Sequence, residues 1–204
     1  MIRLVVLFVL TVVSLAARAE APVILVFGDS ISAGFGLGAR DQGWVTLLQD
    51  KVQSAGYGYR VVNASVSGET TAGGLVRLPR ALSVHHPSIV VLELGGNDGL
   101  RALPVAAMRA NLAQMASLAR AAGAQVVLLG MRIPPNYGTV YTQQFHAVFS
   151  QVARELHLQF VDFLLQDVAL SADLMQADGV HPNGLGQPHL LQAIWPALQP
   201  LLRK

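Results

Sequence analysis

Five short apolar runs, separated by segments with the features of helices, constrain the fold of this chain most. The runs cover residues 23–27, 59–62, 89–94, 125–129 and 159–161. They contain many β-branched residues and mostly lack the alternation of polar and apolar residues that a strand with one face in water shows. Such runs predict buried strands of a parallel sheet, because helices cover both faces of a parallel sheet.

The segments between the runs predict helices. They cover residues 44–55, 74–84, 104–122 and 139–156, and a last helix is expected over 184–202, disturbed by Pro188 and Pro196. The third begins with Pro104 and ends at Gly123, residues that are favoured at the two ends of a helix. Alternating strands and helices predict an α/β fold. In such folds ligands bind beyond the carboxyl ends of the strands.

The length and the N-terminus predict one domain behind a signal peptide. With 204 residues, 52% of them hydrophobic, the chain is long enough for one sizeable core and short for two. Residues 1–19 contain Arg3, an apolar run and a final Ala17-Arg18-Ala19, the pattern of a cleaved secretory signal. A membrane anchor is the alternative, but the run is shorter than the roughly 20 residues that span a bilayer. We expect a mature domain over 20–204, periplasmic or secreted, with no stable membrane span.

The charge of the mature domain argues against nucleic acid as a partner. Of the 14 basic residues, Arg3 and Arg18 fall in the signal peptide, which leaves 12 against 12 acidic residues. Because the remaining basic residues form no cluster, we expect no nucleic-acid binding. The chain has no cysteine, so packing has to supply its stability even in an oxidising compartment.

A serine, a histidine and an aspartate stand at positions that suit nucleophilic catalysis. Ser30 stands three residues after the end of the first predicted strand, behind Gly28 and Asp29, which would place its hydroxyl at the mouth of the sheet. Asp178 and His181 are three residues apart, so the carboxylate can bind one ring nitrogen and leave the other to accept the serine proton. The alternatives are a cap or turn role for Ser30 and a metal site for the pair. Because no third ligand stands nearby, we expect no metal.

Two further positions can supply the hydrogen-bond donors that acyl transfer requires. Gly68 follows the second predicted strand, and Asn97 lies in a Gly-Gly-Asn-Asp block after the third. The amides of Ser30 and Gly68 and the side chain of Asn97 would bind the oxyanion of a tetrahedral intermediate. For Asn97 alone, the alternative is a turn residue. The nucleophile, the base, its orienting acid and the oxyanion donors are all assigned to other residues, so we expect Glu93 to be structural.

A possible dinucleotide fingerprint is misplaced in this chain. Residues 34–39 satisfy the pattern G-x-G-x-x-A, but they begin seven residues after Phe27 instead of directly at the end of the strand. The second strand ends near Asn63, where a nicotinamide enzyme would carry an acidic residue. We therefore expect no nicotinamide cofactor.

Four short blocks, at residues 28–32, 63–70, 95–98 and 178–182, resemble those of the SGNH subgroup of the GDSL hydrolases. That subgroup is named for a serine, a glycine, an asparagine and a histidine, here Ser30, Gly68, Asn97 and His181. The blocks are most similar to the periplasmic acyl thioesterase, arylesterase and lysophospholipase branch of the family. Ile31 stands where the Gly-Asp-Ser-Leu motif of the family usually has a leucine. The resemblance implies a three-layer α/β/α sandwich with a flavodoxin-like five-stranded parallel sheet in the order 2-1-3-4-5. It also implies no cofactor and hydrolysis of acyl esters and thioesters.

Two loops rich in apolar residues accompany the predicted site. Leu100, Leu103 and Pro104 follow the Gly-Gly-Asn-Asp block, and Ile133 and Tyr137 follow the fourth predicted strand. We expect them to line an acyl groove for a small-molecule ester, thioester or lysophospholipid substrate, in a monomeric enzyme. An O-acetyl esterase of cell-wall or exopolysaccharide sugars is the alternative function. A binding protein without catalysis is more distant, because it would not need all five site residues.

Overall fold

The five predicted strands form one parallel sheet in the computed structural model, which describes residues 20–38 and 42–204. The strands are β1 (Val23–Gly28), β2 (Arg60–Asn63), β3 (Ile89–Glu93), β4 (Gln125–Leu129) and β5 (Gln159–Val161). Their order is β2-β1-β3-β4-β5, which confirms the order that the family resemblance implied. The predicted signal peptide, residues 1–19, lies outside the described residues.

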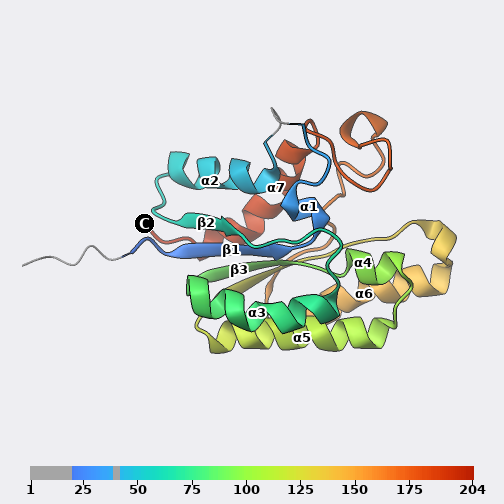
Figure 1. Ribbon diagram of the computed structural model, residues 1–204, viewed down its shortest axis with the longest axis horizontal. Coiled ribbons are helices and arrows are strands. Elements are labelled where there is room, and N and C mark those ends of the chain that lie inside the picture. Colours follow the sequence, from blue (N-terminus) through green and yellow to red (C-terminus); the bar gives the residue numbers. More distant parts are fainter. Residues whose placement is uncertain (1–19, 39–41) are drawn as a thin grey trace, which may run out of the picture.

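Helices cover both faces of the sheet, as predicted (Figure 1). On one face lie α1 (Ser30–Ala33), α2 (Trp44–Ser54) and α7 (Gln187–Leu198). On the other lie α3 (Thr71–His85), α4 (Gly96–Leu100), α5 (Val105–Ala121) and α6 (Thr139–Glu155). Short 3-10 turns occur at η1 (Pro135–Tyr137), η2 (Ala172–Leu174) and η3 (Gln199–Leu201). Every residue of β1 and β3 is buried, so the core lies around these two central strands.

The central pair of strands determines where a site can form. β1 pairs with β3, and Gly28 at the end of β1 is the partner of Glu93 at the end of β3. The loops that follow these two strands therefore start side by side. The connections on the two sides of this pair run in opposite directions across the sheet, and ligands bind at such switch points in open parallel sheets.

The structure differs from the expected elements at helix ends and in two short helices. The last helix begins at Gln187 and not at 184, and Pro188 stands in its first turn, where a proline costs no hydrogen bond. α3 begins earlier than expected because the Thr70 side chain accepts a hydrogen bond from the Gly73 amide and caps it. The short helices α1 and α4 were not predicted. Within the described ranges, no helix is long and apolar enough to cross a membrane.

Candidate active site

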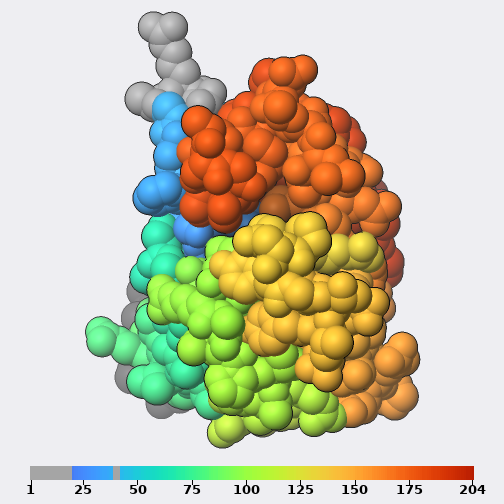
Figure 2. Space-filling view, turned by 90° about the vertical axis from the view of Figure 1, so that its right-hand side faces the viewer, coloured from blue at the N-terminus to red at the C-terminus, as the bar shows by residue number. Residues whose placement is uncertain are grey.

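The predicted site residues gather at the face where the strands have their carboxyl ends. Figure 2 shows this face hollowed between the orange-red segment that follows β5 and the green and yellow segments that follow β3 and β4. The blue segment of β1 and α1 is visible between them. The site is thus assembled from loops that are far apart in the sequence.

Ser30, His181 and Asp178 form one continuous hydrogen-bonded chain. The Nε2 atom of His181 lies 2.8 Å from the hydroxyl oxygen of Ser30, and Nδ1 lies 2.7 Å from the Oδ2 atom of Asp178. The His181 side chain is 15% exposed and that of Asp178 is 40% exposed. One ring nitrogen can therefore donate to the carboxylate while the other accepts the serine proton.

The loop that carries the histidine is built around the Asp178 carboxylate. Its Oδ1 atom accepts hydrogen bonds from the amides of Val180 (2.9 Å) and His181 (3.0 Å). Burial raises the pKa of Asp178, but these amides and the His181 ring outweigh it and lower the pKa to about 2. Asp178 therefore stays ionised in neutral solution, which keeps the imidazole oriented.

The nucleophile candidate lies at the start of a one-turn helix. Asp29 is the N-cap of α1, and its Oδ1 atom accepts a hydrogen bond from the Ile31 amide at 3.1 Å. Ser30 is the first residue of the helix, separated from the end of β1 at Gly28 by Asp29 alone, and is partly exposed. This cap fixes how the chain turns from β1 into α1 and so positions Ser30 at the end of the sheet.

Asp29 also contacts Asn97, the candidate oxyanion donor. The Nδ2 atom of Asn97 donates a hydrogen bond to Oδ2 of Asp29 at 3.0 Å. An amide nitrogen carries two hydrogens, so the second remains available for a substrate oxygen. Gly95 enters α4 with a φ of 117°, a conformation that favours glycine. The buried Asp29 carboxylate thus links the nucleophile turn to the asparagine, a role that no local pattern in the sequence indicates.

Gly68 is held from both sides of its loop. Its φ is 78°, in the left-handed region, and its carbonyl accepts a hydrogen bond from Nη2 of Arg101 at 3.0 Å. The Val66 amide donates to the Gly28 carbonyl at 3.0 Å, which anchors the loop to the end of β1. Asp98 accepts hydrogen bonds from the amide and the hydroxyl of Thr71 and so joins α4 to the start of α3. The loops of Gly68 and Asn97 are therefore joined to each other.

Glu93 is fully buried beneath the nucleophile turn. Its Oε2 atom accepts hydrogen bonds from the Ser32 hydroxyl at 2.6 Å and from the Asp29 amide at 3.2 Å. A β-carbon at position 28 would collide with this carboxyl group, so the Gly28 of the motif is required by close approach. Burial, reinforced by the nearby charge of Asp29, raises the pKa of Glu93 well above its ordinary value. Burial likewise raises the pKa of Asp29 to about 6, against hydrogen bonds from Ile31 and Asn97.

We expect Glu93→Gln to flatten the pH dependence of stability. Above the ordinary value of 4.5, unfolded Glu93 releases a proton that the folded state still holds. The free energy of unfolding of the unmodified protein should therefore fall as the pH rises through this range, and the glutamine variant should lose that part of the slope. Asp29 contributes a slope of the same sign up to about pH 6, and this part remains.

Urea unfolding at a series of pH values from 4.5 upward measures this effect. Glu155→Gln, which removes an exposed carboxylate paired with Arg109, is the control for the loss of one surface carboxylate. Parallel curves for the unmodified protein and Glu93→Gln would show that Glu93 titrates normally.

The two loops expected to line an acyl groove are joined by tyrosines. The hydroxyl of Tyr137 donates to the carbonyl of Leu100 at 2.8 Å, and that of Tyr141 donates to the carbonyl of Leu103 at 2.9 Å. Leu103 is 36% exposed and Pro104 is exposed, so both present surface. Ile133 is only 9% exposed and packs beneath Gly99, so here it supports the loop from below.

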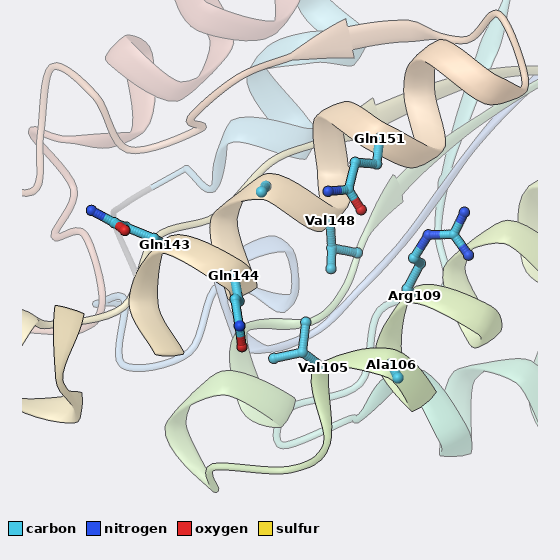
Figure 3. A pocket seen from close by; sticks show the side chains of 8 residues that line it. Val105, Ala106, Arg109, Gln143, Gln144, Val148 and Gln151 are labelled. Atoms are coloured by element: carbon cyan, nitrogen blue, oxygen red, sulfur yellow. The ribbon is translucent and has the colours of Figure 1, made fainter. Parts of the chain in front are cut away.

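Two hollows on the surface lie outside this constellation. One of about 490 Å³ lies between α5 and α6, where Val105, Ala106 and Val148 meet three glutamines and Arg109 (Figure 3). Another, of about 530 Å³, is lined by residues 169–179 beside the Asp178 loop. Neither includes Ser30 or Asn97. Across the described part of the chain, no three histidine, aspartate or glutamate side chains gather in the manner of a metal site.

Comparisons with known proteins agree with this geometry. The sequence model of the GDSL-like Lipase/Acylhydrolase family matches residues 26–188, which include all four motif blocks. Esterase TesA of Pseudomonas aeruginosa is 52% identical over 193 residues, which cover 95% of this chain and 96% of the relative. Thioesterase 1/protease 1/lysophospholipase L1 of Escherichia coli K12 is 41% identical over 184 residues, covering 90% and 86%. A crystal structure of TesA superposes with a TM-score of 0.85 and 53% identity, covering 88% of this chain and 99% of that one.

Proposed function

The chain belongs to the GDSL-like lipase and acylhydrolase family and is an esterase, and from this premise we propose that it cleaves acyl esters and thioesters through an acyl-enzyme on Ser30. The observation that carries the proposal is the hydrogen-bonded chain from Ser30 through His181 to Asp178, with distances of 2.8 and 2.7 Å. A weakly acidic hydroxyl beside a base is suited to direct attack on a carbonyl.

In the proposed acylation step, the Ser30 oxygen attacks the carbonyl carbon of the substrate, and its proton moves to Nε2 of His181. The carbonyl oxygen becomes an oxyanion, which accepts hydrogen bonds from the Ser30 and Gly68 amides and from Nδ2 of Asn97. When the intermediate collapses, His181 returns the proton to the departing oxygen or sulfur. Asp178 stays ionised and stabilises the imidazolium.

In the proposed deacylation step, water replaces the leaving group. His181 takes a proton from the water as it attacks the acyl carbon, and the same donors stabilise the second oxyanion. When this intermediate collapses, the bond between the acyl carbon and the Ser30 oxygen breaks, His181 returns its proton to that oxygen, and the carboxylic acid leaves. All the residues in this scheme come from one chain, so the proposed reaction needs no side chain from a second subunit.

The proposed substrates are acyl esters, thioesters and lysophospholipids. The names of the E. coli and P. aeruginosa relatives support this range, since they include thioesterase, lysophospholipase and esterase. The partly exposed Leu103 and the exposed Pro104 stand just beyond the asparagine that would bind the oxyanion. An acyl chain leaving the carbonyl carbon would therefore meet an apolar loop.

We expect Leu103→Ala to flatten the dependence of activity on acyl length. Each methylene that the loop covers contributes roughly 0.8 kcal/mol, so kcat/KM should rise with acyl length up to a limit in the unmodified enzyme. The variant should lose activity on octanoyl esters and keep it on acetyl esters, because the reacting groups are untouched. Steady-state kinetics with acetyl, butyryl and octanoyl nitrophenyl esters below the micelle concentration measure this.

The outcomes of that series separate the candidate functions. An equal loss on all three esters would indicate a damaged oxyanion site, and an unchanged profile would place the acyl chain along another surface. A preference of the unmodified enzyme for acetyl esters would favour the sugar O-acetyl esterase. Val84→Ala, at an exposed residue of α3, serves as the matched control.

We also propose that the enzyme is exported and that mature protein begins at Glu20. The charged start, the apolar run and the Ala17-Arg18-Ala19 pattern support this proposal. Sequencing the N-terminus of protein from the periplasmic fraction should give Glu20. An intact N-terminus in the membrane pellet would support the anchor instead.

A further inference from the structure

We propose that Phe35 determines specificity for the leaving group by forming the wall of the site beside His181. The Phe35 and His181 rings lie with their centroids 4.8 Å apart and their planes tilted by 43°. Phe35 is nevertheless 52% exposed, although large aromatic side chains tend to be well buried. Part of the ring therefore contacts the base, and the rest faces solvent beside the site.

The backbone of Phe35 is fixed to the nucleophile turn. α1 ends at Gly34, whose φ of 75° reverses the chain. The amides of Gly34 and Phe35 both donate to the carbonyl of Ser30, the second at 3.0 Å. The position of the aromatic ring is thus tied to the residue that carries the nucleophile.

Gln176 fixes the same segment to the histidine loop. Its Nε2 atom donates to the Phe35 carbonyl at 2.8 Å and to the Pro182 carbonyl at 3.0 Å. Its backbone amide donates to the His181 carbonyl at 2.8 Å. Gly36, with a φ of 71°, lies so close to the Gln176 side chain that a β-carbon there would collide with it. The contact between Phe35 and His181 is therefore built into the fold.

The chemistry of the proposed mechanism, on which this inference rests, places the leaving group next to Phe35. His181 protonates the departing atom, which must lie within hydrogen-bonding distance of Nε2. The substituent on that atom therefore extends past the imidazole that Phe35 touches. The acyl chain starts from the carbonyl carbon, whose oxygen faces Asn97 and the 100–104 loop. Phe35 thus contacts aromatic or apolar leaving groups and leaves acyl selectivity to the other loop.

Paired esters with one acyl group test this assignment. Benzyl butyrate and ethyl butyrate share the acyl chain and have alkyl alcohols as leaving groups, so they differ mainly in the size of the group beside Phe35. Phe35→Ala should lower kcat/KM for the benzyl ester about 3- to 10-fold more than for the ethyl ester, the usual size of an aromatic contact. Phe35→Leu should give a smaller difference, and Val84→Ala should give none.

A second measurement separates this role from simple support of the histidine. A small fluorophosphonate releases fluoride, so the rate at which it modifies Ser30 depends on the triad and not on contacts between Phe35 and a large leaving group. This rate should change little in Phe35→Leu. Equal losses on both esters, accompanied by equally slower modification, would overturn the proposal and assign Phe35 to holding His181. If the unmodified protein hydrolysed neither ester through Ser30, the proposed function itself would fail.

Discussion

Ser30→Ala is expected to lower kcat for ester hydrolysis by on the order of 10⁵- to 10⁶-fold, the usual effect of removing a serine nucleophile from a triad. Without the hydroxyl, no acyl-enzyme can form, and the His181 ring has lost its partner at 2.8 Å. The remaining oxyanion donors give only a small residual rate. Because Ser30 is partly exposed, the substitution should leave the fold and the thermal midpoint nearly unchanged.

The measurement combines kinetics with covalent modification. A fluorophosphonate should add one phosphonyl group to Ser30, identified by mass spectrometry of the peptide that contains it, and should add none to the alanine variant. Ser65→Ala is the matched control, because the Ser65 hydroxyl has no hydrogen-bond partner among the described residues. Hydrolysis that persists in Ser30→Ala, or activity that chelators abolish and a metal ion restores, would contradict the acyl-enzyme mechanism.

The sheet could be predicted because its strands have a strong local signal. The apolar runs at 125–129 and 159–161 match β4 and β5 at both ends, and strands buried on both faces produce such runs wherever a parallel sheet forms. The order of the strands followed from the family resemblance, because periodicity along the chain contains no information about which strands are neighbours.

The short helices that carry the site could not be predicted by the same means. α1 and α4 have four and five residues, too few for a helical period to appear. They form because Asp29 caps one and Gly95 turns the chain into the other. The sequence therefore indicated Ser30 and Asn97 as reactive positions without indicating the structures that hold them.

The supporting carboxylates depended on contacts between distant residues. Glu93 meets the Asp29 amide across 64 positions of sequence, through the pairing of β1 with β3. A charged residue at the end of an apolar strand is the one local signal of this role. The contact of Phe35 with His181 likewise depends on how the loops after β1 and β5 pack against each other. No local sequence pattern indicates that packing.

Asn97→Ala is expected to lower kcat roughly 100- to 1000-fold, the usual cost of losing one oxyanion donor. KM should change little, since the hydrogen bond forms fully only when the carbonyl oxygen becomes negative. The same loss should appear for acetyl and octanoyl esters, because the donor acts on the carbonyl and not on the acyl chain. Modification of Ser30 by a fluorophosphonate should remain possible but become slower.

The hydrogen bond to Asp29 gives Asn97 a structural role as well, so kcat and the thermal midpoint have to be measured together. Asn97 donates one amide hydrogen to Oδ2 of Asp29, so alanine removes a structural bond together with the donor. Asn97→Asp keeps the shape but has no hydrogen to donate when ionised, and it places a second carboxylate beside Asp29. It should therefore be as inactive as alanine. Asn136→Ala, at an exposed residue of η1, controls for the loss of a surface asparagine. A loss in kcat below about threefold, together with a lower thermal midpoint, would assign Asn97 to holding α4 in place, because a missing oxyanion donor costs far more than that.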